Sequence, residues 1–169
     1  MNPVPLSPLP LTAPAFEPFG VVIQPPGGPG RVINAGSARR FELAPDLQLH
    51  ALDGRASLSL FRAQARSFPQ TLTVLERHAL GSQSFIPLGV RRFVIVVATA
   101  GAFPRAQDLR AFVTDGMQGV MLAPGVWHHA LLAVDAGDFA VIERAADAVD
   151  CEESTLPQPV LLSLDLPTR

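Results

Sequence analysis

Short runs of alternating apolar and polar residues recur along the whole chain. Leu58 and Leu60 alternate with serines, and Leu72 and Val74 alternate with threonines. Because successive side chains of a strand point to opposite faces, this period of two predicts β-strands with one buried face. About ten short strands are expected, at residues 21–24, 48–52, 57–60, 71–74, 85–88, 92–98, 120–122, 130–134, 139–144 and 160–164.

The segments between these runs are rich in turn-forming residues. The 169-residue chain contains 17 prolines and 13 glycines. Many short strands separated by such turns are typical of a sandwich or a barrel. Helical patterns are scarce, and the clearest is a short turn after Thr12, with Thr12 as its N-cap and Pro14 in its first turn. We therefore expect an all-β fold with little helix.

Length and composition favour a single globular domain. A chain of 169 residues can enclose one sizeable core, and a hydrophobic content of 48% argues against disorder. No internal repeat or linker divides the sequence, so we expect one domain over residues 1–169 with an extended N-terminal segment at residues 1–10. The proline- and glycine-rich residues 24–30 are expected to form a surface loop.

Charge and cysteine content narrow the partners and the compartment. A net charge of −2 gives no attraction to nucleic-acid phosphates or anionic lipids. The longest strongly apolar stretch, residues 93–103, is too short to span a membrane, and the N-terminus lacks a signal-peptide pattern. Cys151 is the only cysteine, so no internal disulfide can form, which favours a reducing compartment. We expect a cytoplasmic protein that binds neither nucleic acid nor membrane.

An acid and an imidazole follow the predicted strand at residues 71–74. If the strand continues, Glu76 and His78 share a face with Leu72 and Val74, and Arg77 points the other way. Placing both groups unpaired in an apolar interior would carry a large desolvation cost. They must therefore form a buried pair, meet water or serve a ligand, and the pattern leaves these alternatives open.

Two further polar stretches follow turn-forming residues. Gly81 permits a sharp turn, and Ser82 and Gln83 after it offer neutral hydrogen-bond donors and acceptors. A Pro-Gly turn at residues 124–125 leads to the only tryptophan and to His128 and His129, which extended geometry sends to opposite faces. Ordinary loop residues at the first stretch and surface histidines at the second would give the same sequence patterns.

Metal and carboxylate binding are both compatible with the sequence. His78 and His128 could belong to a metal site, although no third ligand is evident from spacing. Asn34 and Arg40 lie in a polar stretch, and an arginine can pair with a carboxylate through two hydrogen bonds. The same stretch could instead form a polar hairpin turn with solvated arginines.

These segments, in this order, resemble the ureidoglycolate lyase family, formerly called ureidoglycolate hydrolases. The resemblance extends from about residue 11 to residue 156. Its most specific parts are Glu-Arg-His-Ala-Leu-Gly-Ser-Gln-Ser-Phe-Ile-Pro at residues 76–87 and Gly-Val-Trp-His-His at residues 125–129. Shorter matches lie at residues 11–20, 33–41, 61–63 and 138–144. A match to several spaced motifs is far stronger than a match to one.

The resemblance implies a cupin-like β-barrel, or jelly roll, that is usually dimeric and acts in allantoin (purine) degradation. It implies ureidoglycolate as substrate, split into glyoxylate and urea. Gly125 and His128 look like the end of the second cupin motif. The first motif is degenerate, because Leu80 stands where a second histidine is expected. A divalent metal such as nickel, held by His78 and His128, is the one cofactor that the family suggests.

Lysis of ureidoglycolate requires that the carboxylate is held, that the hydroxyl loses a proton and that the leaving nitrogen gains one. The proton transfers are assigned to three residues: Glu76, His78 and His128. Recognition of the substrate is assigned to Ser82, Gln83 and Asn34, with Arg40 as a clamp on the carboxylate. Two alternatives stay open: a metal-dependent cupin acting on another small hydroxy acid, and a non-catalytic cupin that binds a small ligand.

Overall fold

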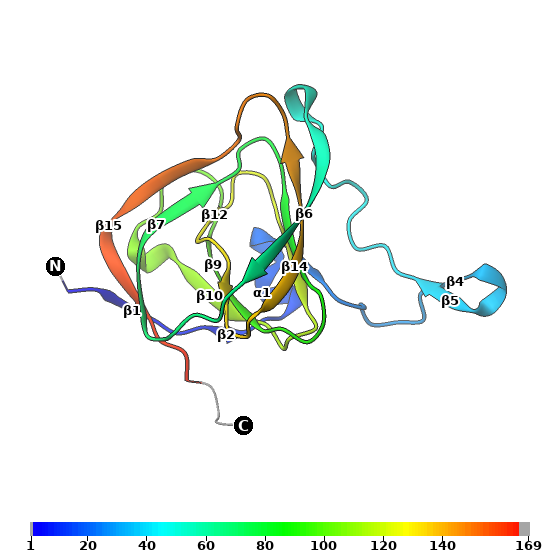
Figure 1. The fold of residues 1–169 in the computed structure, drawn as a ribbon, viewed down its shortest axis with the longest axis horizontal. Coiled ribbons are helices and arrows are strands. Elements are labelled where there is room, and N and C mark those ends of the chain that lie inside the picture. Colours follow the sequence, from blue (N-terminus) through cyan, green and yellow to red (C-terminus); the bar gives the residue numbers. More distant parts are fainter. Residues whose placement is uncertain (1, 166–169) are drawn as a thin grey trace.

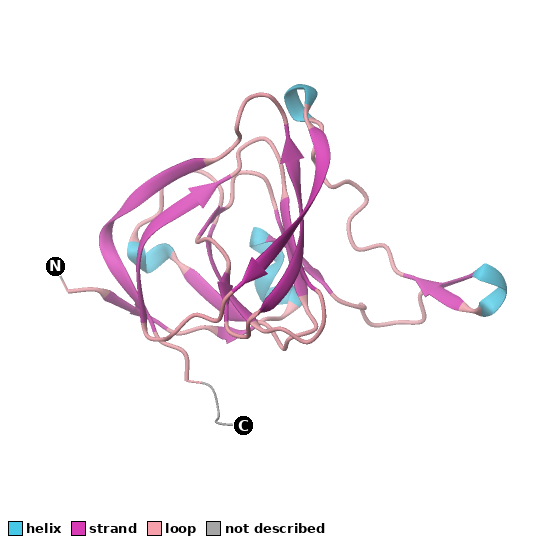
Figure 2. Cartoon of the chain, viewed as in Figure 1, coloured by secondary structure: helices cyan, strands magenta, loops and turns pink. Residues whose placement is uncertain are grey.

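Strands make up most of the regular structure. The computed structural model describes residues 2–165, and Figure 2 shows the predominance of strands. Within these residues the one α-helix is α1 (Ala13–Phe16), which Thr12 caps by accepting a hydrogen bond from the N–H of Ala15. Four short 3₁₀ turns occur, at Glu17–Phe19, Asn34–Gly36, Ala51–Asp53 and Ala106–Asp108. The expected all-β fold with little helix is confirmed.

The larger sheet has the strand order β1-β15-β7-β12-β9-β10-β2, and β13 pairs with β9. Its pairs are antiparallel, except that β1 runs parallel to β15 and β2 runs parallel to β10. Its strands are β1 (Val4–Leu6), β2 (Leu9–Pro10), β7 (Gln70–Arg77), β9 (Phe93–Ala98), β10 (Arg110–Val113), β12 (Trp127–His128), β13 (Leu132–Ala133) and β15 (Glu152–Leu162).

The second sheet is antiparallel, with the order β3-β11-β8-β14-β6. Its strands are β3 (Gly20–Ile23), β6 (Arg55–Ala63), β8 (Gln83–Pro87), β11 (Gly119–Leu122) and β14 (Gly137–Ala145). A separate hairpin of β4 (Arg31–Ile33) and β5 (Ala38–Arg40) projects from the barrel, at the right of Figure 1.

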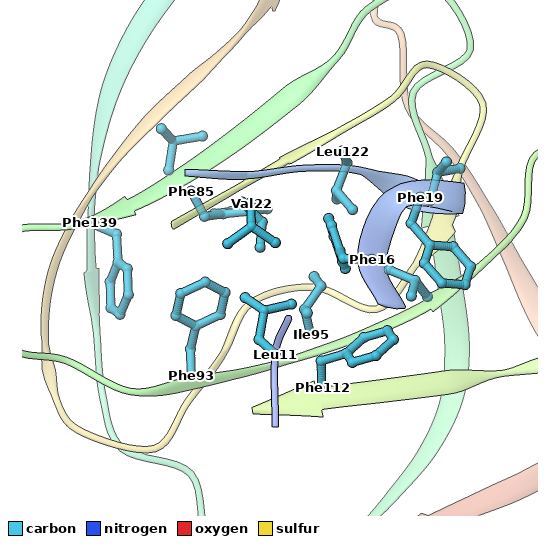
Figure 3. Close-up of a cluster of buried hydrophobic side chains, with 14 of the residues drawn as sticks. Leu11, Phe16, Phe19, Val22, Phe85, Phe93, Ile95, Phe112, Leu122 and Phe139 are labelled. Carbon is cyan, nitrogen blue, oxygen red and sulfur yellow. The ribbon is translucent and has the colours of Figure 1, made fainter. Parts of the chain in front are cut away.

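Strand β9 lies between two apolar clusters. Phe93, Ile95 and Val97 belong to the first cluster, where Phe93 packs edge-on against Phe139 (Figure 3). The alternate residues Val94, Val96 and Ala98 belong to the second cluster, which also contains Trp127. Burial on both faces explains why this strand reads as a continuous apolar run rather than an alternating one. Within the described residues, no helix is both long and apolar enough to cross a membrane.

The strand expected at residues 48–52 is not formed. Gln48, Leu52 and Asp53 have positive φ angles of 52°, 47° and 58°, which extended strands do not adopt. The Asp46 carboxylate accepts a hydrogen bond from the N–H of Gln48 at 2.8 Å and so closes a local turn. Leu49 is nevertheless buried, so the apolar position reflects a loop that anchors one side chain.

Candidate active site

Four polar residues from the two sheets meet beside the first apolar cluster. His128 lies directly opposite Glu76 where β12 pairs with β7, and Gln83 lies opposite Glu143 where β8 pairs with β14. Directly opposed residues share one face of a sheet. His128 also lies opposite Val97, a member of the first cluster. Both polar pairs therefore face the interior between the sheets.

A chain of hydrogen bonds connects these four residues. The Gln83 Nε2 donates to the Glu143 carboxylate at 2.9 Å, and the Gln83 Oε1 lies 3.2 Å from the His128 Nε2. The Glu76 Oε1 lies 3.4 Å from the same nitrogen. The His128 Nδ1 lies 3.0 Å from the carbonyl oxygen of Val126. Both ring nitrogens thus face oxygen acceptors, so either nitrogen can donate a hydrogen bond when it carries a proton.

His78 completes the cluster just beyond the end of β7. Its Nδ1 is hydrogen-bonded to the carbonyl oxygen of Asp150, and the Asp150 carboxylate accepts from the N–H groups of Ala79 and Leu80 at 2.8 and 2.9 Å. The His78 Nε2 is buried and has no hydrogen-bond partner among the described residues. The ring centroids of His78 and His128 are 5.4 Å apart. A histidine held through Nδ1 keeps Nε2 for a proton or a ligand.

Two glycines allow the close approaches around the histidines. Gly125 has a φ of +80°, a conformation that favours glycine, and its N–H donates to the carbonyl oxygen of His78 at 2.7 Å. A Cβ on Gly81 would lie only 2.5 Å from the Cβ of Arg144. Arg144 in turn donates to the carbonyl groups of residues 51–52 at 2.8 and 2.9 Å. These contacts tie the loop at residues 51–54 to the edge of the site.

The local electrostatics keep one carboxylate ionised beside the histidines. The hydrogen bond from His128 lowers the pKa of Glu76 below its ordinary value, although burial opposes this shift. Burial lowers the pKa of His129, against the effect of its hydrogen bond to the carbonyl of Ala130. Burial raises the pKa of the Cys151 thiol, and the nearby carboxylates, including Glu76, raise it further. The site therefore presents an anionic Glu76 and a thiol that stays protonated.

Glu76, His78, Gln83 and His128, which the sequence singled out, are brought together. Arg77 points away from them, as strand alternation predicts: its guanidinium lies 4.5 Å above the centre of the Trp127 ring. The expectation that Leu72 shares their face is wrong, because Leu72 packs into the second cluster. Leu75, three positions further along β7, packs into the same cluster, so the alternation of β7 breaks between these two leucines. The break lies where the pairing of β15 with β7 shifts register.

Ser82, Asn34 and Arg40 lie elsewhere in this chain. The Ser82 hydroxyl is buried and donates to the carbonyl oxygen of Leu47 at 2.5 Å. Asn34 and Arg40 belong to the projecting hairpin (Figure 1), where Arg40 pairs with Glu42 at 3.0 Å. The structure of one chain does not bring these two residues to the cluster. Within one chain, both residues lie in a polar hairpin turn with solvated arginines, the alternative that the sequence left open.

The sequence reasoning missed two residues of the site, Glu143 and Asp150. Glu143 had a usable signal, because it follows Phe139 and Val141 at steps of two along β14, and both are fully buried. An acid at the next inward-facing position predicts a buried polar contact. Asp150 lies in a loop between β14 and β15 and follows no periodic pattern. Only the fold reveals that it holds His78.

Glu76, His78 and His128 could hold a metal ion. One potential ligand atom from each lies within 4.8 Å of the others. Both histidines have Nδ1 beside a backbone carbonyl, which is the usual second contact of a metal-binding histidine. Glu76 supplies the third ligand that the sequence could not identify. A second group of Glu76, Cys151 and Glu153 is as compact, but two of its members are exposed.

Comparison with known proteins identifies the family. A family model described as Ureidoglycolate lyase matches residues 3–163. The chain belongs to the ureidoglycolate lyase family. Among its relatives, a protein named ureidoglycolate lyase from Pseudomonas syringae is 44% identical over 157 residues, which cover 92% of each chain. One of the same name from Burkholderia mallei is 45% identical over 157 residues and covers 92% of each chain.

A third ureidoglycolate lyase, from Azotobacter vinelandii, is 43% identical over 159 residues, or 94% of this chain and 96% of the relative. The family that the motifs indicated is thereby confirmed. The ureidoglycolate lyase motif at residues 76–87 also supplies three of the clustered side chains: Glu76, His78 and Gln83.

Proposed function

We propose that this protein is an enzyme that cleaves ureidoglycolate into glyoxylate and urea at the cluster of Glu76, His78 and His128. One observation carries the proposal. His78 is half-buried, and its buried Nε2 has no hydrogen-bond partner among the described residues. Its ring centroid lies 5.4 Å from that of His128, whose ring nitrogens both face oxygen acceptors. The pair offers a proton acceptor and a proton donor at one place. Family membership and the names of the relatives support the substrate.

The proposed reaction removes one proton from the substrate hydroxyl and donates one to the leaving nitrogen. The His78 Nε2 removes the proton of the substrate hydroxyl, and the electron pair left on that oxygen forms the carbonyl of glyoxylate. The carbon–nitrogen bond breaks, and its electron pair stays with the ureido nitrogen. His128 gives that nitrogen a proton, which completes urea. Glu76 stabilises the cationic form of His128 before the transfer.

Substrate binding is proposed for the neighbouring polar groups. The Gln83 Oε1 lies beside His128 and can accept a hydrogen bond from the ureido group. Ser82, Asn34 and the carboxylate clamp Arg40 stay predictions, because none of them contacts the cluster within this chain.

The same three residues fit a divalent metal such as nickel. When bound, the metal would act as a Lewis acid toward the hydroxyl or carboxylate of the substrate. Metal binding can be measured without substrate and can therefore be tested separately from turnover.

Nickel is expected to raise the melting temperature of chelator-treated protein. A ligand that binds only the folded state adds about 2.7 kcal/mol of stability at one hundred times its Kd. The His78→Gln variant should lose most of this shift, whereas Arg77→Gln, on the opposite face of the strand, should retain it. Equal shifts in the wild type and His78→Gln, measured by calorimetry, would contradict ligation at this cluster.

We also propose that the enzyme is a homodimer. The family resemblance implied a dimer, and the apolar strands at residues 92–98 and 160–164 would be natural candidates for the interface, but they are largely buried within this chain. Strand β6, at the edge of the second sheet, instead exposes Leu58 by 74% and Leu60 by 56%. A two-fold dimer, the commonest assembly, would cover such apolar side chains with the same surface of a second copy.

Light scattering at micromolar concentration should give twice the 18.0 kDa mass of one chain. Because a charge is costly to bury in an apolar interface, the Leu58→Glu/Leu60→Glu double variant should be a monomer. A single 18.0 kDa species for the wild type would refute the dimer.

The proposed setting is allantoin (purine) catabolism in the cytoplasm. The substrate and both products belong to that chemistry, and the lone free thiol of Cys151 suits a reducing compartment. The direct assay is release of urea and glyoxylate from ureidoglycolate by the purified protein. Equimolar products support the proposal. Ligand binding without turnover would favour the non-catalytic alternative, and turnover of a different hydroxy acid alone would favour the other enzyme.

A further inference from the structure

The orientation of the Gln83 amide is decided by Glu143. Gln83 is 5% exposed and has one end against a carboxylate and the other against His128. A carboxylate only accepts hydrogen bonds, so the amide nitrogen must face Glu143 and the carbonyl oxygen must face His128. With the amide reversed, two oxygens would oppose each other at the Glu143 side.

We propose that Glu143 is a positioning residue for the reaction, acting through Gln83, a role that rests on the proposed function. By fixing the amide, it keeps a hydrogen-bond acceptor turned toward the His128 Nε2 and toward the substrate. A ureido group, which carries N–H donors, fits that acceptor. A substrate with an oxygen acceptor at the same place would meet repulsion and be rejected.

The contact between Gln83 and Glu143 follows from the strand pairing. Gln83 and Glu143 are directly opposite in the register of β8 and β14, so their side chains start from adjacent positions on one face. Glu143 is half-buried, and an exposed surface pair would not hold an amide in one orientation as firmly. Glu143 therefore contacts Gln83, and Gln83 in turn contacts His128.

The first test is Glu143→Gln, whose side chain has nearly the same size and can either donate or accept. We expect kcat to fall by about 10- to 100-fold, the scale of a lost hydrogen bond to an ionised group. Glu17→Gln removes one charge from an exposed position outside the site and is the matched control, with kcat unchanged. An unchanged kcat in folded Glu143→Gln would overturn the proposal.

A double-mutant cycle separates positioning from general stability. In a Gln83→Leu background, adding Glu143→Gln should leave kcat per folded molecule unchanged. The Gln83→Glu/Glu143→Gln double variant should recover part of the activity that Gln83→Glu loses, because a carboxylate–amide contact is restored with its polarity reversed. Equal effects of Glu143→Gln with and without the Gln83 side chain would overturn the proposal.

One readout does not depend on turnover. In the wild type, the side-chain amide protons of Gln83 should exchange slowly with solvent in NMR spectra, and Glu143→Gln should speed this exchange at least several-fold. If the wild type releases no urea while the exchange behaves as expected, the proposed function fails and the orientation stands. If the wild type is active and exchange is identical in both proteins, the positioning role fails alone.

Discussion

Replacement of His128 by glutamine is expected to lower turnover by about 10²–10⁴-fold, the usual loss when acid–base assistance is removed. Glutamine retains a polar side chain that can bond to Glu76 or Gln83, so the variant should fold. The measurement is urea release per folded molecule, with the folded fraction taken from circular dichroism and thermal unfolding. KM should change less than kcat, because the proton is given in the transition state.

The opposite outcome has a definite meaning. If His128 is only a satisfied core residue, His128→Gln should lower the melting temperature and leave activity per folded molecule intact. A normally folded and fully active variant would remove His128 from the mechanism. His78 with Glu76 would then be the remaining pair for proton transfer.

Replacement of His78 by glutamine should cause a loss of similar size, again about 10²–10⁴-fold in kcat, because the glutamine amide is not a base. The His78 Nε2 makes no hydrogen bond among the described residues, so the loss of stability should come mainly from the lost bond between Nδ1 and the Asp150 carbonyl, about 0.5–1.5 kcal/mol. The matched control is Arg77→Gln, one residue earlier on the opposite face of β7.

Arg77→Gln should retain kcat and lose about 0.5–2 kcal/mol of stability, because it removes a cation–π contact with Trp127 and an ion pair with Glu152. The same loss of turnover in both variants would mean that the strand, rather than the imidazole, is what activity requires. Full activity of folded His78→Gln would exclude His78 as the base.

Much of the site could be predicted because strand alternation fixes which neighbours share a face. Glu76 and His78 were placed on one face and Arg77 on the other by period-two geometry alone, and their observed positions agree. The motif match then placed His128 beside them. The cross-strand pairing that brings Glu76 opposite His128 depends on register between segments about fifty residues apart, which local patterns do not encode.

The errors have equally physical causes. The segment around Leu49 resembled a strand because a loop that buries one leucine shows the same short alternation. The carboxylate clamp at Arg40 is not among these errors and stays a prediction. Its residue type fits the role, but whether its hairpin folds onto a site or projects from the barrel depends on tertiary contacts that local sequence does not encode. Asp150 acts partly through its backbone carbonyl, which every residue type has, so no sequence signal could identify it.

The central claim is that ureidoglycolate reacts between His78 and His128, and the most direct measurement is a crystal structure of the slow His128→Gln variant with ureidoglycolate bound. The substrate hydroxyl should lie at about 3 Å, hydrogen-bond distance, from the His78 Nε2. The contrary result would place the substrate in the hollow lined by Arg40, Ser84 and Ile142. Ser84 follows the inward-facing Gln83 and therefore points to the other face of its sheet. Substrate bound there, with nothing between the two histidines, would contradict the account.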